Sequence, residues 1–337
     1  MQQQADIFEN EIVSKYPEVL EKLLLDHTTG KNIIWATDDY ENLGESYLSG
    51  KEITTELITG DNGNIIMPRV HKDKILQKTR TKEKAEIFTP SWVCNAQNNL
   101  IDNAWFGKEN VFNFESNKPN ETQKWEVNDK KIEFPKDKSW KDYVKDRRLE
   151  ITCGEAPYIT SRYDTTNGEF IQVENRIGLL DRKLRVINEN VDKSGEWLKA
   201  AQTAFKSIYA FEWQGDSLLL AREAMLVTFI ENYRLKFNEE PLLKSLKFIA
   251  YIISWNVWQM DGLKGVIPNS CGPKKVEEET LYGTNTIVTP CMGCKDEEIR
   301  NHNGTYCLIK DWRMKDPSTG RMGLKLRFID LIGKPKA

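Results

Sequence analysis

Apolar residues recur at helical and strand spacings in alternation along the middle of the chain. An amphipathic pattern with three- and four-residue spacing predicts helices at residues 176–206, 218–237 and 242–250. Shorter apolar runs predict β-strands between them, at residues 148–152, 207–213 and 251–260. Because strands that alternate with helices are typical of a parallel sheet with crossover connections, we expect an α/β fold.

The two ends of the chain differ from this middle region. Residues 1–30 carry a helical apolar pattern, residues 32–36 resemble a short strand, and residues 37–70 are rich in loop residues. The C-terminal part contains most of the cysteines. We therefore predict three units: a helical and mixed N-terminal region at 1–84, an α/β domain at 85–265, and a cysteine-rich segment with a tail at 266–337.

Composition excludes several classes of protein. Hydrophobic residues make up 39% and aromatic residues 10% of the 337-residue chain, which excludes global disorder and a collagen-like repeat. A net charge of −3 excludes a protein that coats nucleic acid through bulk charge. No apolar run approaches the roughly 20 residues of a membrane span, and the first residues contain no secretory leader. We expect a cytoplasmic protein without a membrane partner.

Four of the six cysteines fall within 37 residues and include one Cys-x-x-Cys pair: Cys271, Cys291, Cys294 and Cys307. Clustered cysteines in a cytosolic protein favour metal binding over disulfides. Four thiolates match tetrahedral zinc, and a site filled entirely by protein is structural because no position remains open for water. His302 is an alternative ligand. The competing interpretation is a set of reduced thiols without a metal.

Small and acidic residues follow the predicted strands. Cys153-Gly154-Glu155-Ala156 comes after the first strand, Glu212 ends the second, and Asp261 follows the third. In an open α/β sheet, a nucleotide-like ligand binds at the carboxyl ends of the strands. Small residues let backbone N–H groups approach the ligand. A carboxylate there can bind both ribose hydroxyls or an exocyclic amine of adenine.

Together with Phe88-Thr89-Pro90, these segments resemble the adenine-specific, S-adenosylmethionine-dependent DNA methyltransferases, the modification subunits of restriction–modification systems. The resemblance covers roughly residues 80–265. It implies a Rossmann-like methyltransferase sheet, S-adenosyl-L-methionine as cofactor, double-stranded DNA as substrate, and an endonuclease or a second methyltransferase subunit as partner. The cofactor-binding residues that it implies are Phe88, Thr89, Pro90, Glu150, Cys153, Gly154, Ala156, Glu212 and Asp261.

The chain departs from that family at one motif. Such enzymes carry an Asn/Asp-Pro-Pro-Tyr/Phe tetrapeptide that binds the target amine and stacks on the flipped base, and no such tetrapeptide occurs here. Glu155-Ala156-Pro157-Tyr158 resembles it but occupies the cofactor turn. Residues 328–335 have one proline and no aromatic residue after it. The resemblance thus predicts an incomplete methyltransferase. The alternatives are a catalytically inactive module that binds DNA or a partner, and a zinc-stabilised interaction protein without a cofactor.

Overall fold

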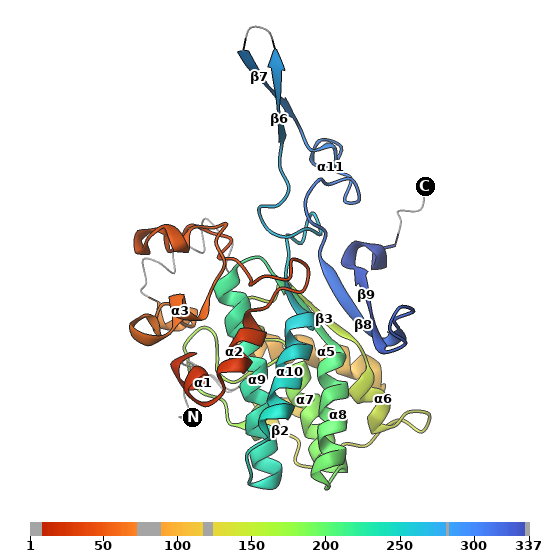
Figure 1. The fold of residues 1–337 in the computed structure, drawn as a ribbon. Helices are drawn as coiled ribbons and strands as arrows, with labels where there is room; N and C mark the ends of the chain where they lie inside the picture. Colours follow the sequence, from red (N-terminus) through yellow and green to blue (C-terminus); the bar gives the residue numbers. More distant parts are fainter. Residues whose placement is uncertain (1–8, 73–88, 117–123, 281–282, 334–337) are drawn as a thin grey trace.

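The computed structural model of the chain describes residues 9–72, 89–116, 124–280 and 283–333 (Figure 1). Its centre is a three-stranded parallel sheet in chain order, formed by β3 (Arg148–Ile151), β4 (Ile208–Glu212) and β5 (Val257–Gln259). Two helices connect each pair of strands: α7 (Leu179–Asn190) and α8 (Ser194–Lys206), then α9 (Gly215–Phe237) and α10 (Leu243–Asn256). The predicted α/β class is confirmed, whereas the Rossmann-like identity of the sheet stays a prediction.

The third predicted strand is wrong over its first half. Residues 251–256 belong to α10, and β5 contains only three residues. Nearly every residue of this stretch is buried, so its apolar pattern has no period that separates a buried helix from a buried strand. Asn256 ends the helix, and its side-chain amide donates to the carbonyls of Phe205 and Ile208.

Alternating residues of β4 face two different layers. Ile208 and Ala210 pack into the main core with the helices, whereas Phe211 packs into a second cluster with Trp258 and Ile309. The antiparallel pair β8 (Leu308–Lys315) and β9 (Met322–Arg327) contributes to that second cluster. The sheet is therefore covered by helices on one face and by the C-terminal hairpin on the other.

The N-terminal region joins the main core. Its helices α1 (Glu9–Lys15) and α2 (Pro17–Leu24) confirm the helical pattern, and Leu20 and Leu23 are buried in the same cluster as the sheet. The predicted domain boundaries stay predictions. The remaining helices and strands are α3 (Thr55–Ile58), α5 (Ser91–Phe106), β1 (Asn113–Glu115), β2 (Trp125–Val127), α6 (Trp140–Lys145), β6 (Lys274–Thr280), β7 (Gly283–Thr289) and α11 (Met292–Lys295).

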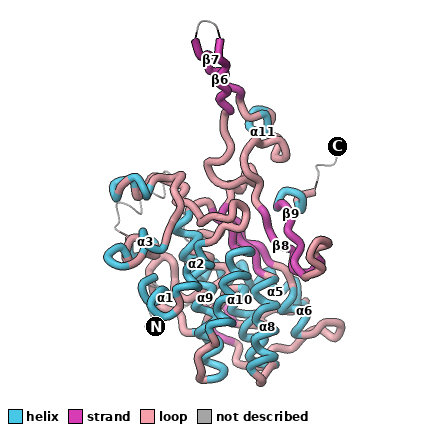
Figure 2. Tube along the Cα trace, in the orientation of Figure 1, coloured by secondary structure: helices cyan, strands magenta, loops and turns pink. Residues whose placement is uncertain are grey.

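One hairpin extends away from the rest of the molecule. Strands β6 and β7 pair antiparallel and project beyond the body, with α11 near the base of the hairpin (Figures 1 and 2). Among the residues that the structure describes, no helix has the length and apolar character needed to cross a bilayer.

Candidate functional site

Glu212 connects the ends of all three parallel strands. One of its carboxylate oxygens accepts the N–H of Gly154, 2.9 Å away, and the other accepts the N–H groups of Trp213 and Gln214. Its main-chain carbonyl accepts the N–H of Met260 at 3.0 Å. Two predicted cofactor residues, Gly154 and Glu212, are thus in direct contact at the carboxyl edge of the sheet.

The turn after β3 is held in an unusual backbone conformation. Gly154 has φ +51° and Ala156 has φ +59°, so both lie in the left-handed region. Glycine adopts this region without strain, whereas alanine is disfavoured there. Ala156 therefore holds the conformation that a glycine would adopt freely. A Cβ atom added to Gly154 would meet no atom within 4 Å, so the space above this residue is open to a ligand.

Glu155 fixes the same turn from the opposite direction. Its buried carboxylate accepts the N–H of Arg69 at 2.8 Å and a short hydrogen bond from the hydroxyl of Tyr163. The sequence contains no signal that would assign Glu155 this role, because Arg69 is 86 residues away. Glu155 thereby ties the N-terminal region to the turn after β3.

Other N-terminal residues also reach this edge. Lys72 forms a buried ion pair with Asp216, at 3.0 Å between Nζ and Oδ2, and Tyr40 donates to the same oxygen. Asp216 lies in the first turn of α9, where a helix favours negative charge. The main-chain carbonyl of Trp35 accepts the N–H of Gly215. Segments before residue 73 therefore contact the start of α9, next to the carboxyl end of β4.

Burial changes the ionisation of the acidic residues at this edge. Burial raises the pKa of Glu212, although the three N–H groups that it accepts oppose the shift. Burial also raises the pKa of Glu150 well above its usual range, and the negative charge of Glu212 adds to this effect. Burial likewise raises the pKa of the Cys153 thiol well above its usual range. Burial therefore favours the uncharged form of each of these groups.

The Phe-Thr-Pro segment lies only partly within the described residues. Phe88 is outside them, while Thr89 and Pro90 precede α5. The carbonyl of Thr89 accepts a hydrogen bond from the hydroxyl of Thr165, and the N–H of Ser91 donates to Asp164. The segment therefore contacts the loop that follows the Gly154 turn. The role of Thr89 and Pro90 at the cofactor stays a prediction.

Asp261 lies in a turn just after β5. Its carboxylate accepts the N–H groups of Leu263 and Lys264, and its own N–H donates to the carbonyl of Val266. Met260, the residue before it, connects this turn to Glu212. Asp261 therefore follows the same edge as Glu212, and its contact with an adenine stays a prediction.

A second site brings together Cys271, Cys291, Cys294 and His302. The sulfur of Cys271 lies 3.4 Å from that of Cys291 and 3.5 Å from that of Cys294. Nδ1 of His302 lies 3.5–3.7 Å from the three sulfurs. Tetrahedral bonds of about 2.3 Å to sulfur place two ligand atoms about 3.8 Å apart, close to these separations. The four residues could hold a metal ion, and the set is compatible with zinc.

The prediction of Cys307 as the fourth ligand is wrong. Cys307 is fully buried in the second core cluster, and its thiol donates to the carbonyl of Gln259. Residue 307 directly precedes β8, and its side chain packs against this cluster and not against the other cysteines. His302, the alternative ligand, occupies the fourth position of the group.

Two further residues shape the cysteine–histidine group. Gly293 lies between Cys291 and Cys294, and a Cβ atom there would come within 2.5 Å of the N atom of His302. Only glycine allows this close approach of the two backbone segments. Asn303 donates its N–H to the sulfur of Cys291, and its side chain exchanges two hydrogen bonds with the backbone of Gly272. No motif in the sequence indicates this role for Asn303.

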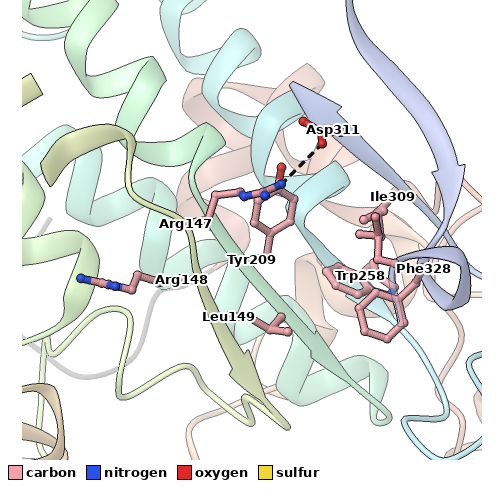
Figure 3. Close-up of a pocket in the computed structure, with 9 residues that line it drawn as sticks. Arg147, Arg148, Leu149, Tyr209, Trp258, Ile309, Asp311 and Phe328 are labelled. Carbon is pink, nitrogen blue, oxygen red and sulfur yellow. Dashed lines mark hydrogen bonds and ion pairs between the residues drawn. The ribbon is translucent and has the colours of Figure 1, made fainter. Parts of the chain in front are cut away.

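A hollow of about 290 Å³ lies on the face of the sheet that β8 covers (Figure 3). Its wall is mostly apolar, with Leu149, Tyr209, Trp258 and Phe328, and the Arg147–Asp311 ion pair lies beside it at 3.4 Å. None of the predicted site residues lines it.

The chain has no significant match among protein-family models, curated proteins or solved structures.

Proposed function

We propose that the chain is the cofactor-binding subunit of an S-adenosylmethionine-dependent DNA adenine methyltransferase. One observation carries the proposal: the carboxylate of Glu212 and the N–H of Gly154 are hydrogen-bonded where two parallel strands end. In doubly wound sheets, a nucleotide-like ligand binds at this position, with its ribose on an acidic residue and its charged part near a small-residue turn.

The residues present fit such a cofactor. Glu212 already accepts three N–H groups, and two carboxylate oxygens offer about four acceptor positions, so acceptor capacity for a ribose hydroxyl remains. The open space above Gly154 lets a ligand approach the backbone. When bound, the cofactor's sulfonium supplies the methyl group. The task of the protein is to align the weakly nucleophilic amine of adenine with that group and to exclude water.

The 337 residues lack the tetrapeptide that holds the target amine. Positioning contributes up to roughly 7–11 kcal/mol in well-oriented reactions, so a chain without this grip should bind the cofactor and transfer methyl groups very slowly. This absence also favours a second candidate function, a methyltransferase-like module that binds DNA or a partner and performs no chemistry.

We further propose that the cysteine–histidine group binds one structural zinc ion. Three thiolates and one imidazole are a common set of ligands for zinc, and four protein ligands leave no position for water. The ion would join α11 to the segments that contain Cys271 and His302. Its role is to fix these loops and the base of the projecting hairpin.

Calorimetry with S-adenosylmethionine tests the cofactor proposal. Glu212→Ala should weaken binding by about 1.5–3 kcal/mol, or roughly 10- to 150-fold, because a charge-assisted hydrogen bond is lost. Glu212→Gln retains the shape of the side chain and controls for loss of folding. Glu109→Ala removes an exposed glutamate and should leave the affinity unchanged. Absence of cofactor binding by the parent chain would contradict the proposal.

Tritiated methyl transfer to unmodified DNA separates the two candidate functions. The isolated chain should show little or no transfer. A complex with a partner that supplies an Asn/Asp-Pro-Pro-Tyr/Phe tetrapeptide should show turnover. Rapid turnover by the isolated chain would mean that another segment holds the target base. If the assembled complex binds the cofactor yet never transfers methyl groups, the non-catalytic module is the better assignment.

A further inference from the structure

Helix α5 directs its polar side chains toward the rest of the molecule. Asn95, Asn98 and Asp102 are each at most 1% exposed. The guanidinium of Arg182 donates to Asp102 at 2.7 Å and to Asn95 at 2.9 Å. The side-chain amide of Asn98 donates to two main-chain carbonyls, at 3.0 and 3.1 Å. The inner side of α5 is therefore held by a buried hydrogen-bond network.

The outer side of the same helix is apolar. Trp92 is 43% and Leu100 is 70% exposed, Ala104 is exposed, and Ala96 is partly exposed. Residues four positions apart are neighbours on a helix surface, so these four form one continuous row, the outer face of α5. The row carries no charge, because Asp102 is the only charged residue of α5 and is buried.

This arrangement is the reverse of an ordinary surface helix. Such a helix buries its apolar stripe and presents its charged residues to water. The outer face of α5 instead leaves the side chains of Trp92 and Leu100 in water, and their burial by another surface would lower the free energy. A contiguous exposed apolar surface is typical of an interaction site. The outer face of α5 thus has the character of an interface.

Large and small residues alternate along the outer face of α5. Trp92 and Leu100 project from the helix, whereas Ala96 and Ala104 leave space beside them. A two-fold axis midway between Ala96 and Leu100 would pair two α5 helices antiparallel. It would place Trp92 opposite Ala104 of the second copy, and Leu100 opposite Ala96 of the second copy. Each large side chain would then enter the space above a small one, which is how helix surfaces interlock.

We propose that two copies of this chain associate through the outer face of α5 around a two-fold axis. The partner is a second copy because this face is complementary to itself: rotation brings its large side chains against its own small ones. Such an interface is closed, since each copy contributes the same surface and no face remains for a third. The inference is independent of the proposed function.

The distribution of charge favours a second copy over nucleic acid as the partner of this face. A face that binds nucleic acid neutralises phosphates with lysine or arginine, and α5 contains neither. Lys124 lies at one end of the face, with its Nζ 4.7 Å from the centroid of the Trp92 ring. In the antiparallel pair, the two Trp92 residues are roughly 18 Å apart along the helix axis. The two Lys124 cations therefore lie at opposite ends of the interface and are screened from each other.

Sedimentation velocity of the full chain tests the proposal. One helix face buries less than the roughly 800 Å² per partner of a standard interface. We therefore expect a dimer with a dissociation constant on the order of 10 µM, measured from about 1 to about 200 µM protein. Leu100→Lys should weaken the dimer by at least about 30-fold, because it places two charges in an apolar contact. The matched control, Leu235→Lys, changes a leucine of α9 that is 51% exposed and should leave the dimer unchanged.

A charge exchange tests the antiparallel register. An equimolar mixture of Ala96→Glu and Leu100→Lys chains brings the introduced acid of one copy against the introduced amine of the other. The mixture should associate at least about threefold more tightly than either variant alone. Urea transitions that match the parent show that each variant is folded.

Three results would overturn the proposal. The first is a parent chain that stays monomeric at about 200 µM, which would leave the outer face of α5 to a different occupant. The second is equal weakening by Leu100→Lys and Leu235→Lys. The third is a mixture that associates no more tightly than its components, which would remove the antiparallel pairing on which the self-complementarity depends.

Discussion

The carboxyl edge of the parallel sheet and the cysteine–histidine group achieve a fixed geometry in different ways. At the sheet edge, Glu212 and Glu155 are held by backbone N–H groups from distant segments, above a large apolar core. At the second site, the polar side chains of Cys271, Cys291, Cys294 and His302 meet one another. Of these four, Cys271 and His302 are only partly buried and Cys294 is exposed.

The comparison shows that burial and coordination are alternative sources of order. A large core fixes polar groups because the surrounding helices cannot move apart without exposing apolar surface. A small loop-rich segment lacks such a core and needs ligand bonds in its place. The two regions should therefore respond to different perturbations.

Removal of the metal should have the largest effect, and only at the second site. Apparent binding free energies of structural zinc reach about 10–16 kcal/mol in small domains, so a chelator should disorder the residues between Cys271 and His302. Hydrogen exchange should accelerate there and remain unchanged in α9 and α10. Elemental analysis should find about one zinc per chain before chelation.

Two substitutions sharpen this prediction. His302→Ala should abolish stoichiometric zinc binding, whereas Cys307→Ala should retain it because the Cys307 thiol donates to the carbonyl of Gln259. Zinc loss in the Cys307 variant, with the body still folded, would argue against the arrangement of the four ligands. Faster exchange throughout the body after chelation would argue against two independent sources of order.

Arg222 offers the corresponding test for the body of the molecule, which is the parallel sheet with the helices packed on it. Its fully buried guanidinium donates to the carbonyls of Leu23, Leu25, Ser254 and Val257. Burial lowers its pKa to about 10. Leu23 and Leu25 lie at the end of α2, where helix carbonyls lack partners of their own.

Arg222→Met should lower the free energy of unfolding by about 3–5 kcal/mol, because it leaves several buried carbonyls unsatisfied. Urea denaturation measures this change, with Arg321→Met at an exposed position as the control. Zinc content should not change. A loss below about 1 kcal/mol would mean that water replaces the guanidinium.

His27 gives the smallest expected effect. Its ring stacks on Trp255 at 4.0 Å between centroids, and its Nε2 lies 2.9 Å from the hydroxyl oxygen of Ser254. Burial, followed by the positive charges of Arg222 and Lys310, lowers the pKa of His27 to about 3. The imidazole therefore stays neutral in the folded body over most of the acidic range.

Between pH 6.5 and 3, the unfolded chain binds a proton at His27 that the folded chain does not. The contribution to stability is present above pH 6.5 and declines by up to about 1.4 kcal/mol for each pH unit below it. Urea denaturation of the body at pH 7 and pH 5 should show a smaller difference for His27→Gln than for the parent. Equal differences would show that the ring is not held neutral.

Local patterns determined much of the secondary structure and part of both sites. The periodicity of apolar residues predicted α9, β3 and β4 to within a few residues, because each buries apolar residues in the core. It also predicted one helical stretch at 176–206, which the structure divides into α7 and α8. The Cys-x-x-Cys spacing predicted a metal site because the two thiols lie on one short turn. Gly154 and Glu212 were predicted together because parallel strands end at one edge.

Only the tertiary structure decided which distant residues complete these sites. His302 and not Cys307 is the fourth residue of the group, because residue 307 directly precedes β8 and packs in the second core cluster. The spacing of the cysteines along the chain does not reveal this difference. Lys72 reaches Asp216 across 144 residues, and Arg69 reaches Glu155 across 86. The apolar run at 251–260 became mainly a helix because burial on all sides removes the pattern that separates helix from strand. Local spacing fixes which groups a short segment can present, whereas packing of the whole chain fixes which groups they meet.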